Sequence, residues 1–380
     1  MHLDVEPMYE PIRVGPLTLR NRFVMPGMQR EWCVEGAPTP RLSEYYRRRA
    51  AGGTALIISE ACAIDHPSST QSTMFAWLTE RSRDAWARCV RAVRGEGAEF
   101  FMQLWHEGAI REVGGDGPLA EHPTLSPSGL ITAEHANGRA LSPDELDELV
   151  AAYVRSARLA REIGASGVEV HACHGYLLDQ FLWRETNRRT DGHGGDDIRD
   201  RLRFPVRVIA AIREAIGPEL ALSVRFSQWK EADYHARIAD SPDELRVVVE
   251  AFESAGADLL HVSTRRFWTP EWPELDPDLG LAGWVKRFAS VPVAAVGSLG
   301  LATDVMTSLD GGPARQTGRP SFQELLRRFD RGDFDLMTVG RAQIADPDWV
   351  AKVRRDAIEE LRTYDEREAA RELEDFVAAW

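Results

Sequence analysis

The sequence predicts an α/β protein built as a (β/α)8 TIM barrel with enlarged βα loops. Short, nearly all-apolar runs alternate with longer amphipathic stretches about eight times, and no break in composition separates the units. Apolar runs of this kind indicate strands that are buried on both faces and therefore parallel. A series of about eight β-then-α units favours a closed barrel over the alternative, a doubly wound open sheet.

The expected strands are short, and most begin after a small residue or a turn. In chain order they are Arg22–Met25, Thr54–Ser59, Ala98–Leu104, Gly167–His171, Ala221–Phe226, Asp258–Val262, Pro292–Val296 and Leu336–Val339.

Four expected helices carry explicit start signals. Ser142–Glu145 and Ser241–Glu244 combine a capping box with proline at the first helical position. Ser321–Glu324 repeats the box without the proline, and Asp346-Pro347 is another start of the cap–proline type. These signals place helices after the predicted strands.

The chain has more residues than the roughly 250 of a minimal barrel, so its loops must be enlarged. The candidates are Glu107–Arg139, Thr264–Leu279 and Leu301–Pro320. We expect one domain over residues 1–380, with a C-terminal helical tail over about 352–380 that either caps the barrel or closes a dimer. Loops after barrel strands carry the chemistry of such folds.

Composition narrows the class of partner. The net charge is −14, with 60 acidic and 46 basic residues, which argues against binding to DNA or RNA. The four cysteines are scattered without a CxxC pair, which fits a reducing compartment and shows no zinc or iron–sulfur box. The N-terminus has no apolar signal core, and no run approaches a membrane span. We expect a cytoplasmic, soluble enzyme with a small-molecule substrate and no membrane partner.

Two histidines and a tyrosine stand at the end of the fourth predicted strand and directly after it. His171, His174 and Tyr176 would lie at the catalytic rim of a barrel. Imidazole N–H groups can stabilise developing enolate charge on a carbonyl oxygen, and a phenol can supply a proton. The alternatives are rim residues that only bind loop carbonyls, or a zinc site that adds Cys173. Zinc is disfavoured because the residues follow a strand and no distant CxxC partner exists.

A second group of residues lies after the last two strands. Gly297-Ser298 follows the seventh strand and Gly340-Arg341 the eighth, where barrels often bind phosphate. Glycine lets backbone N–H groups approach the anion, and Arg341 would add a bidentate charge. The pair indicates a phosphorylated cofactor.

Two polar residues stand inside apolar strands. Arg225 cannot be left unpaired there, so it either forms an internal ion pair or faces the N1–C2 carbonyl edge of a flavin. Gln103 is a buried amide that needs partners, and the uracil-like edge of a flavin offers both a donor and an acceptor.

Taken together, these residues resemble the Old Yellow Enzyme family of FMN-dependent NAD(P)H:flavin oxidoreductases. The resemblance runs from Pro11–Phe23 to Asp346–Val350, and its most specific stretch is Gly167–Phe181, continuing to Asn187–Asp191. It implies FMN as bound cofactor, NADH or NADPH as co-substrate, and a homo-oligomer such as a dimer or tetramer as a possibility.

The resemblance also implies roles for individual residues. His171 and His174 would hold a substrate carbonyl above the flavin, and Tyr176 would protonate the substrate. Flavin-binding residues would be Pro26, Gly27, Met28, Gln29, Ala61, Gln103, Arg225, Gly297, Ser298, Gly340 and Arg341. Trp105, in a position that shapes the substrate pocket in related enzymes, and Trp268, in an aromatic loop, are further candidate substrate contacts.

The implied reaction is reduction of the C=C bond of α,β-unsaturated carbonyl compounds, with hydride from NAD(P)H passing through FMN N5. One alternative is flavin-dependent oxidation or N-demethylation of a methylated amine. Related amine dehydrogenases typically have tyrosine where His171 stands and carry an iron–sulfur domain. Another alternative is a pathway-specific dehydrogenase or isomerase that uses the same site.

Three positions depart from the family pattern. Gln29 stands where the family usually has Thr or Cys, Gly27 stands where proline is frequent, and Gly108-Ala109 replaces a Gly-Arg pair. The loop segment Phe267–Trp272 is unusually aromatic, which indicates either packing of an enlarged loop or a wall around a large or cationic substrate.

Overall fold

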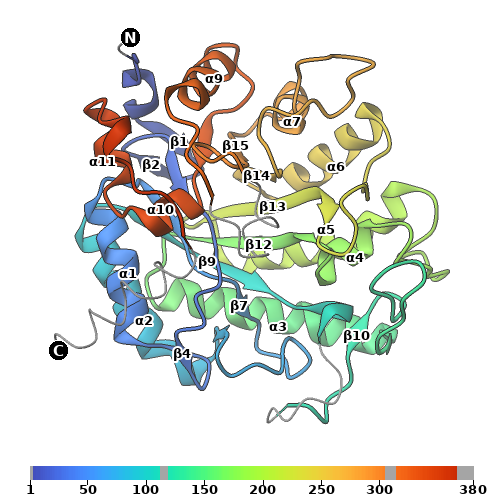
Figure 1. Ribbon diagram of the computed structural model, residues 1–380. Coiled ribbons are helices and arrows are strands. Elements are labelled where there is room, and N and C mark those ends of the chain that lie inside the picture. Colours follow the sequence, from blue (N-terminus) through green and yellow to red (C-terminus); the bar gives the residue numbers. More distant parts are fainter. Residues whose placement is uncertain (1–2, 112–118, 304–313, 366–380) are drawn as a thin grey trace.

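Eight parallel strands close into a barrel at the centre of the computed structural model, which describes residues 3–111, 119–303 and 314–365 (Figure 1). The barrel strands are β3 (Phe23–Met25), β6 (Leu56–Ile58), β9 (Glu99–Trp105), β12 (Gly167–His174), β13 (Ala221–Lys230), β14 (Leu259–Ser263), β15 (Val293–Val296) and β16 (Leu336–Thr338). Each pairs in parallel with the next, and β16 returns to β3. The barrel and all eight expected strands are confirmed.

Helices cover the outside of the barrel (Figure 1). They are α1 (Pro40–Ala51), α2 (Arg83–Gly95), α3 (Pro143–Glu162), α4 (Leu177–Leu182), α5 (Ile198–Ile216), α6 (Pro242–Ser254), α7 (Leu281–Phe288), α9 (Arg319–Asp330), α10 (Arg341–Ala345) and α11 (Trp349–Arg354). Among the helices in the described ranges, none has both the length and the apolar composition needed to cross a bilayer.

A hairpin closes the amino end of the barrel. Strands β1 (Ile12–Val14) and β2 (Leu17–Leu19) pair antiparallel, and Val14 and Leu19 join a buried apolar cluster with strand residues such as Leu56. This packing fills the lower part of the interior. In the barrel interior this leaves the carboxyl ends of the strands for a ligand cavity, where barrels place their chemistry.

The helix start signals were confirmed in part. At α3 the Ser142 hydroxyl accepts from the Glu145 amide at 3.3 Å while the Glu145 carboxylate accepts from the Ser142 amide at 2.8 Å. At α6 the Ser241 hydroxyl accepts from the Glu244 amide. The predicted start at Ser321 is wrong, because α9 already begins at Arg319 and the Ser321 hydroxyl accepts from the Gly300 amide.

The start expected at Asp346-Pro347 is displaced by two residues. Asp348 occupies the cap position of α11, which begins at Trp349, and the Asp346 carboxylate accepts from the Asp348 amide and from Lys352.

The predicted helical tail over about 352–380 is wrong across its described part. Helix α11 ends at Arg354, a single 3₁₀ turn follows at Ile358–Glu360, and Tyr364 forms an antiparallel bridge with Ala314. Arg319 holds this segment on α9 through ion pairs with Asp356 and Glu359. Residues 366–380 lie outside the described residues, as do 112–118 and 304–313 of two enlarged loops.

Candidate active site

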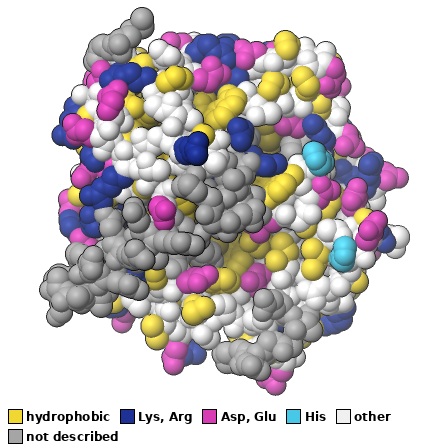
Figure 2. Space-filling view, viewed as in Figure 1, with side chains coloured by type: hydrophobic (Ala, Val, Ile, Leu, Met, Phe, Trp, Pro, Cys, Tyr) yellow, Lys and Arg dark blue, Asp and Glu magenta, His cyan; other side chains and the backbone are white. Residues whose placement is uncertain are grey.

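A cavity of about 380 Å³ opens at the carboxyl ends of the barrel strands. Most of the predicted site residues line it: Gly27, Met28, Gln29, Ala61, Gln103, Trp105, His171, His174, Tyr176, Arg225, Gly297, Ser298, Gly340 and Arg341. They come from positions far apart in the chain, and the barrel brings them to one face. On the face that Figure 2 shows, acidic and basic side chains are interspersed.

Two predicted residues do not line this cavity. Pro26 lies beside Gly340 instead: a Cβ built on Gly340 would be 3.5 Å from the Pro26 Cγ. Trp268 packs edge-on against Phe267, with ring centroids 5.1 Å apart, and its carbonyl accepts from Arg328. The predicted substrate contact of Trp268 is therefore corrected: the aromatic stretch packs against itself and against neighbouring segments, as Trp272 does on Trp284 of α7 at 5.5 Å.

The rings of His171, His174 and Tyr176 converge on one side of the cavity. The His171 ring centroid lies 5.3 Å from that of His174 and 5.1 Å from that of Tyr176, both in edge-on arrangements. His174 adopts a left-handed backbone with φ 64°, and its amide donates to the Ser227 hydroxyl at 3.1 Å. A non-glycine residue in this conformation costs free energy and persists where the surroundings impose it, often at functional sites.

Both histidines are neutral over the ordinary pH range. Burial, followed by the positive charge of Arg225, lowers the pKa of His171 to about 3. The same two causes lower the pKa of His174 well below its usual value. His174 is further oriented by the Ser263 hydroxyl, 2.8 Å from its Nε2, and by Trp229, which stacks on it at 4.5 Å. Neutral, oriented imidazoles can donate hydrogen bonds to a carbonyl oxygen.

The zinc alternative has matching ligand types at this place. Ligand atoms of His171, Cys173 and His174 all lie within 4.8 Å of one another. Burial raises the pKa of the Cys173 thiol well above its usual value, and Arg225 adds a positive charge beside both imidazoles. The local charge favours a carbonyl or enolate oxygen over a metal cation.

Arg225 and Gln103 form the floor of the cavity. Arg225 donates to the Gly27 carbonyl at 3.4 Å and to the Ser263 hydroxyl at 3.3 Å. Gln103 donates through Nε2 to Glu169 at 2.7 Å. Burial alone would raise the pKa of Glu169, but His261, 2.8 Å away, Arg225 and Gln103 hold it at about 2. Glu169 is thus a buried anion that orients the Gln103 amide. The positive charge of Arg225 stabilises this carboxylate.

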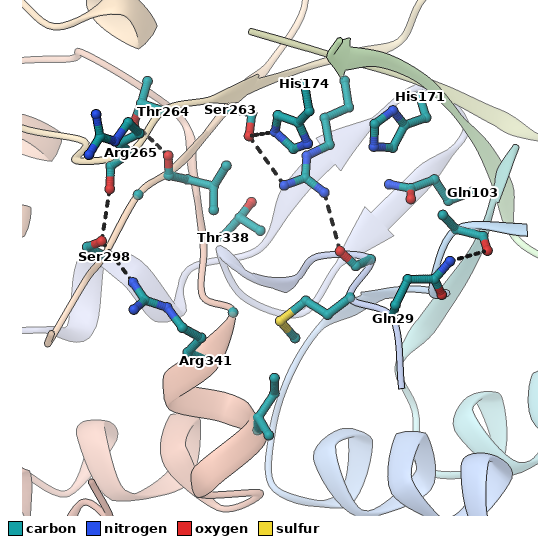
Figure 3. Close-up of a pocket in the computed structure, with 18 of the residues that line it drawn as sticks. Gln29, Gln103, His171, His174, Ser263, Thr264, Arg265, Ser298, Thr338 and Arg341 are labelled. Carbon is teal, nitrogen blue, oxygen red and sulfur yellow. Dashed lines mark hydrogen bonds between the residues drawn. The ribbon is translucent and has the colours of Figure 1, made fainter. Parts of the chain in front are cut away.

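Arg341 and Ser298 form a polar corner at the other end. Arg341 donates to the Ser298 hydroxyl at 3.0 Å and to the Thr303 carbonyl at 2.8 Å. Figure 3 shows this corner on the opposite side of the cavity from His171 and His174. A Cβ on Gly297 would lie 2.6 Å from the Thr264 hydroxyl and 2.7 Å from the backbone nitrogen of Phe267. The glycine is therefore required for the close approach of the two loops.

Unsatisfied polar atoms in the cavity wall indicate what the cavity fits. Arg225 Nε, Thr338 Oγ1 and Gln29 Oε1 are buried and have no hydrogen-bond partner within the part of the chain that the structure describes; Gln29 donates through Nε2 to the Ala61 carbonyl at 3.3 Å. Buried polar groups are normally paired, so these atoms indicate a polar ligand. A guanidinium and an amide at one end, with arginine and serine at the other, suit a flavin ring that carries a phosphate tail. The residues present fit FMN.

The structure also places residues in the wall that the sequence interpretation did not include. They are Arg30, Trp229, Glu231, Ser263, Thr264, Arg265, Val296, Leu299, Leu301, Thr338, Ala342, Ile344 and Tyr364. Trp229 could have been found, because alternate residues of a strand share a face and it follows Arg225 by four residues in β13. Glu231 directly follows the end of that strand. Tyr364 gives no such signal, since only a long-range bridge brings it to the barrel.

Comparison with known proteins gives a match over most of the chain. Residues 7–360 match the family described as NADH:flavin oxidoreductase / NADH oxidase. The chain is 32% identical over 363 residues to an NADH oxidase of Thermoanaerobacter brockii, covering 92% of this chain but 51% of that protein. It is 30% identical over 370 residues to 12-oxophytodienoate reductase 7 of Oryza sativa subsp. japonica, covering 92% of this chain and 88% of that one.

The chain spans about half the length of two of these curated relatives, the NADH oxidase and a metal reductase of Desulforamulus reducens, of which it covers 50%. Among solved structures, morphinone reductase in complex with tetrahydroNAD aligns with a TM-score of 0.77 and 26% identity over 95% of this chain and 93% of that chain. An Old Yellow Enzyme homologue from Zymomonas mobilis shares the fold, with a TM-score of 0.74, 23% identity, and 96% and 98% of the two chains covered.

Proposed function

Because the chain belongs to the NADH:flavin oxidoreductase / NADH oxidase family, we propose that it reduces the carbon–carbon double bond of α,β-unsaturated carbonyl compounds. The expected resemblance to Old Yellow Enzyme is confirmed, and the protein is an oxidoreductase that uses FMN and a nicotinamide nucleotide. The observation that carries the proposal is the convergence of two neutral imidazoles and one phenol on one side of the cavity.

FMN, when bound, supplies the hydride; the protein supplies binding, orientation and proton transfer. We assign the ring to Gln103 and Arg225, whose polar atoms form the floor, and the phosphate to the corner of Ser298 and Arg341. The remaining proposed cofactor contacts are Gly27, Met28, Gln29, Ala61, Gly297 and Gly340, with Pro26 supporting Gly340 from behind.

His171 and His174 hold the carbonyl oxygen of the substrate in this proposal. The pKa of each histidine is lowered by burial and by Arg225, so each imidazole is neutral. Its single N–H group can donate a hydrogen bond to the carbonyl oxygen of the bound substrate. The same N–H groups then stabilise the negative charge that develops on the oxygen as the double bond is reduced.

Tyr176 gives the proton to the α-carbon. Burial, followed by the charge of Glu231, raises the pKa of the phenol well above its usual value, so the phenol keeps its proton until a basic carbon forms beside it. Trp105 packs edge-on against Tyr176 at 5.3 Å and limits how the ring can turn.

Small-molecule substrates, a cytoplasmic location and a homo-oligomeric state belong to the same proposal. The four cysteines are free and buried, which supports a reducing compartment. The names of the similar 12-oxophytodienoate and morphinone reductases support the direction of the reaction for this chain.

The test separates the two half-reactions of the FMN-loaded protein under anaerobic conditions. Tyr176→Phe should slow reoxidation by an enone by about 10²- to 10⁴-fold, the range for loss of a general acid, and should leave reduction by NAD(P)H nearly intact. Tyr153→Phe is the matched control, because it removes a buried tyrosine hydroxyl on α3, away from the cavity wall, that has no hydrogen-bond partner among the described residues. Reoxidation that is unchanged in Tyr176→Phe, or bleaching of the oxidised protein by an N-methylated amine while enones have no effect, would overturn the proposal.

A further inference from the structure

Glu231 lies beside the hydroxyl of the proposed proton donor. The Tyr176 oxygen is 3.4 Å from each of the two carboxylate oxygens of Glu231, and both side chains line the cavity. Glu231 is exposed at the mouth, whereas the Tyr176 ring is half-buried and packs against His171 and Trp105. The carboxyl group is thus in contact with the phenol on one side and with solvent on the other.

The backbone around both residues is fixed by buried contacts. The Glu231 amide donates to the His174 carbonyl at 3.1 Å. Lys230 and Asp179 form a fully buried ion pair of 2.7 Å, and Asp179 also accepts from the Gly175 amide at 2.7 Å. The neighbours of Glu231 and of Tyr176 are therefore anchored to the same buried pair, which holds the two side chains in register.

The reaction assigned to Tyr176 leaves a phenolate that must regain a proton in every cycle. Aromatic rings surround the phenol, and water reaches it less easily than it reaches the mouth of the cavity. A carboxyl group that is open to solvent on one side and adjacent to the phenol on the other can carry this proton.

We propose that Glu231 relays protons from solvent to Tyr176, an inference that rests on the proposed function. Tyr176 passes its O–H proton to the α-carbon of the substrate and becomes a phenolate. The carboxylic acid of Glu231 then gives its proton to the phenolate, and the resulting carboxylate takes a proton from water. The O–H bond of Tyr176 is exchanged for a C–H bond of the product, the O–H bond of Glu231 for that of Tyr176, and an O–H bond of water for that of Glu231, which leaves hydroxide in the solvent. No electrons move between protein groups.

The surrounding charges determine how the relay depends on pH. Protein atoms around the carboxyl raise the pKa of Glu231, and Arg225 opposes the rise. On the Tyr176 side, Glu231, Glu107 and Cys173 all raise the pKa of the phenol after burial. Lys230, next in sequence, is bound to Asp179. Only the protonated form of Glu231 delivers, so steady-state turnover should fall as pH rises through its pKa.

The experiment compares Glu231→Gln with Glu107→Gln on the FMN-loaded protein, with an enone as substrate. Both substitutions remove one negative charge near Tyr176, but Glu231 is hydrogen-bonded to the phenol and lines the cavity, whereas Glu107 acts on the phenol through its charge and lies outside the described cavity wall. Glu231→Gln should lower steady-state turnover at least about tenfold, slow the first turnover much less, and lose the pH dependence. Turnover of this variant should rise with buffer concentration at constant pH, because small acids replace the missing carboxyl. Glu107→Gln should keep the wild-type profile.

Three results would overturn the relay. Equal behaviour of the two variants would mean that only charge matters, and an unchanged pH profile in Glu231→Gln would remove the carboxyl from the proton path. If Tyr176→Phe reoxidises with the enone as fast as wild type, the proposed function fails first. That result is distinguishable, because it is seen with Glu231 intact.

Discussion

Replacing Gly27 by alanine is expected to weaken the binding of FMN, because the added methyl group has no room. A Cβ at this position would lie 2.5 Å from the Ser59 carbonyl oxygen and 2.7 Å from the Gln103 Oε1, about 0.9 Å inside the 3.4 Å at which ordinary contact begins. The Ser59 carbonyl is backbone at the end of β6 and cannot turn away. Either the turn carrying Gly27 rises into the cavity, or Gln103 moves off Glu169.

Overpacking of this kind costs about 1–3 kcal/mol. If the strain falls on the cofactor-bound state, the dissociation constant of FMN should be about 5- to 150-fold larger. The assay is titration of the apoprotein with FMN, followed by quenching of flavin fluorescence. Gly95→Ala is the matched control: a Cβ at the end of α2 meets nothing within 4 Å, so FMN affinity should not change. Unchanged FMN affinity in Gly27→Ala would refute the packing argument.

Two further predictions concern buried charge. Burial raises the pKa of Glu60 from 4.5 to about 7, so this carboxyl binds more protons in the folded than in the unfolded state in this interval. Its contribution to stability should be fully present below about pH 4.5 and be lost, by up to about 3 kcal/mol, as pH rises through 7. Urea titrations across this interval should show a difference in slope of this size between wild type and Glu60→Gln; parallel slopes would contradict the assignment. Lys230→Met should cost about 3–5 kcal/mol by leaving Asp179 buried and uncompensated, and Lys230→Met with Asp179→Asn should recover much of the loss in the same titrations. A double variant no more stable than Lys230→Met would show that the charge is not the cause.

The barrel was predictable because its strands are buried on both faces. Each of the eight runs is dominated by apolar residues. A strand that is buried on both faces of a barrel needs such a run, so the local sequence and the tertiary packing agree. Residues that directly follow such a strand must lie at the carboxyl rim. This is why the positions of His171, Tyr176 and Ser298 followed from the order of elements alone.

The parts that escaped prediction depend on contacts between distant segments. β13 continues four residues beyond Phe226 through Ser227, Gln228 and Lys230, residues with weak strand preference. Pairing with β12 across a register shift and the buried ion pair of Lys230 with Asp179 keep this stretch extended. The predicted strand therefore ended too early, and Trp229 and Glu231 were left out of the site.

The C-terminal segment was mispredicted for the same reason. Its amphipathic pattern predicts a helix, yet Arg319 forms ion pairs with Asp356 and Glu359, and Tyr364 forms a bridge with Ala314. A helix would forgo these contacts. Tertiary binding energy outweighs helix propensity here, as it commonly does at the ends of a chain segment.

Buried polar atoms of Arg225, Thr338 and Gln29 have no partner among the described residues, and this also affects the cellular level of the folded protein. A ligand that binds only the folded chain stabilises it by mass action, by about 2.7 kcal/mol at a hundredfold excess over the dissociation constant. Because FMN would satisfy atoms that otherwise stay desolvated and unpaired, the folded population should follow the supply of flavin. Growth with little riboflavin should then lower the level of this protein through turnover of the unfolded chain, at constant synthesis.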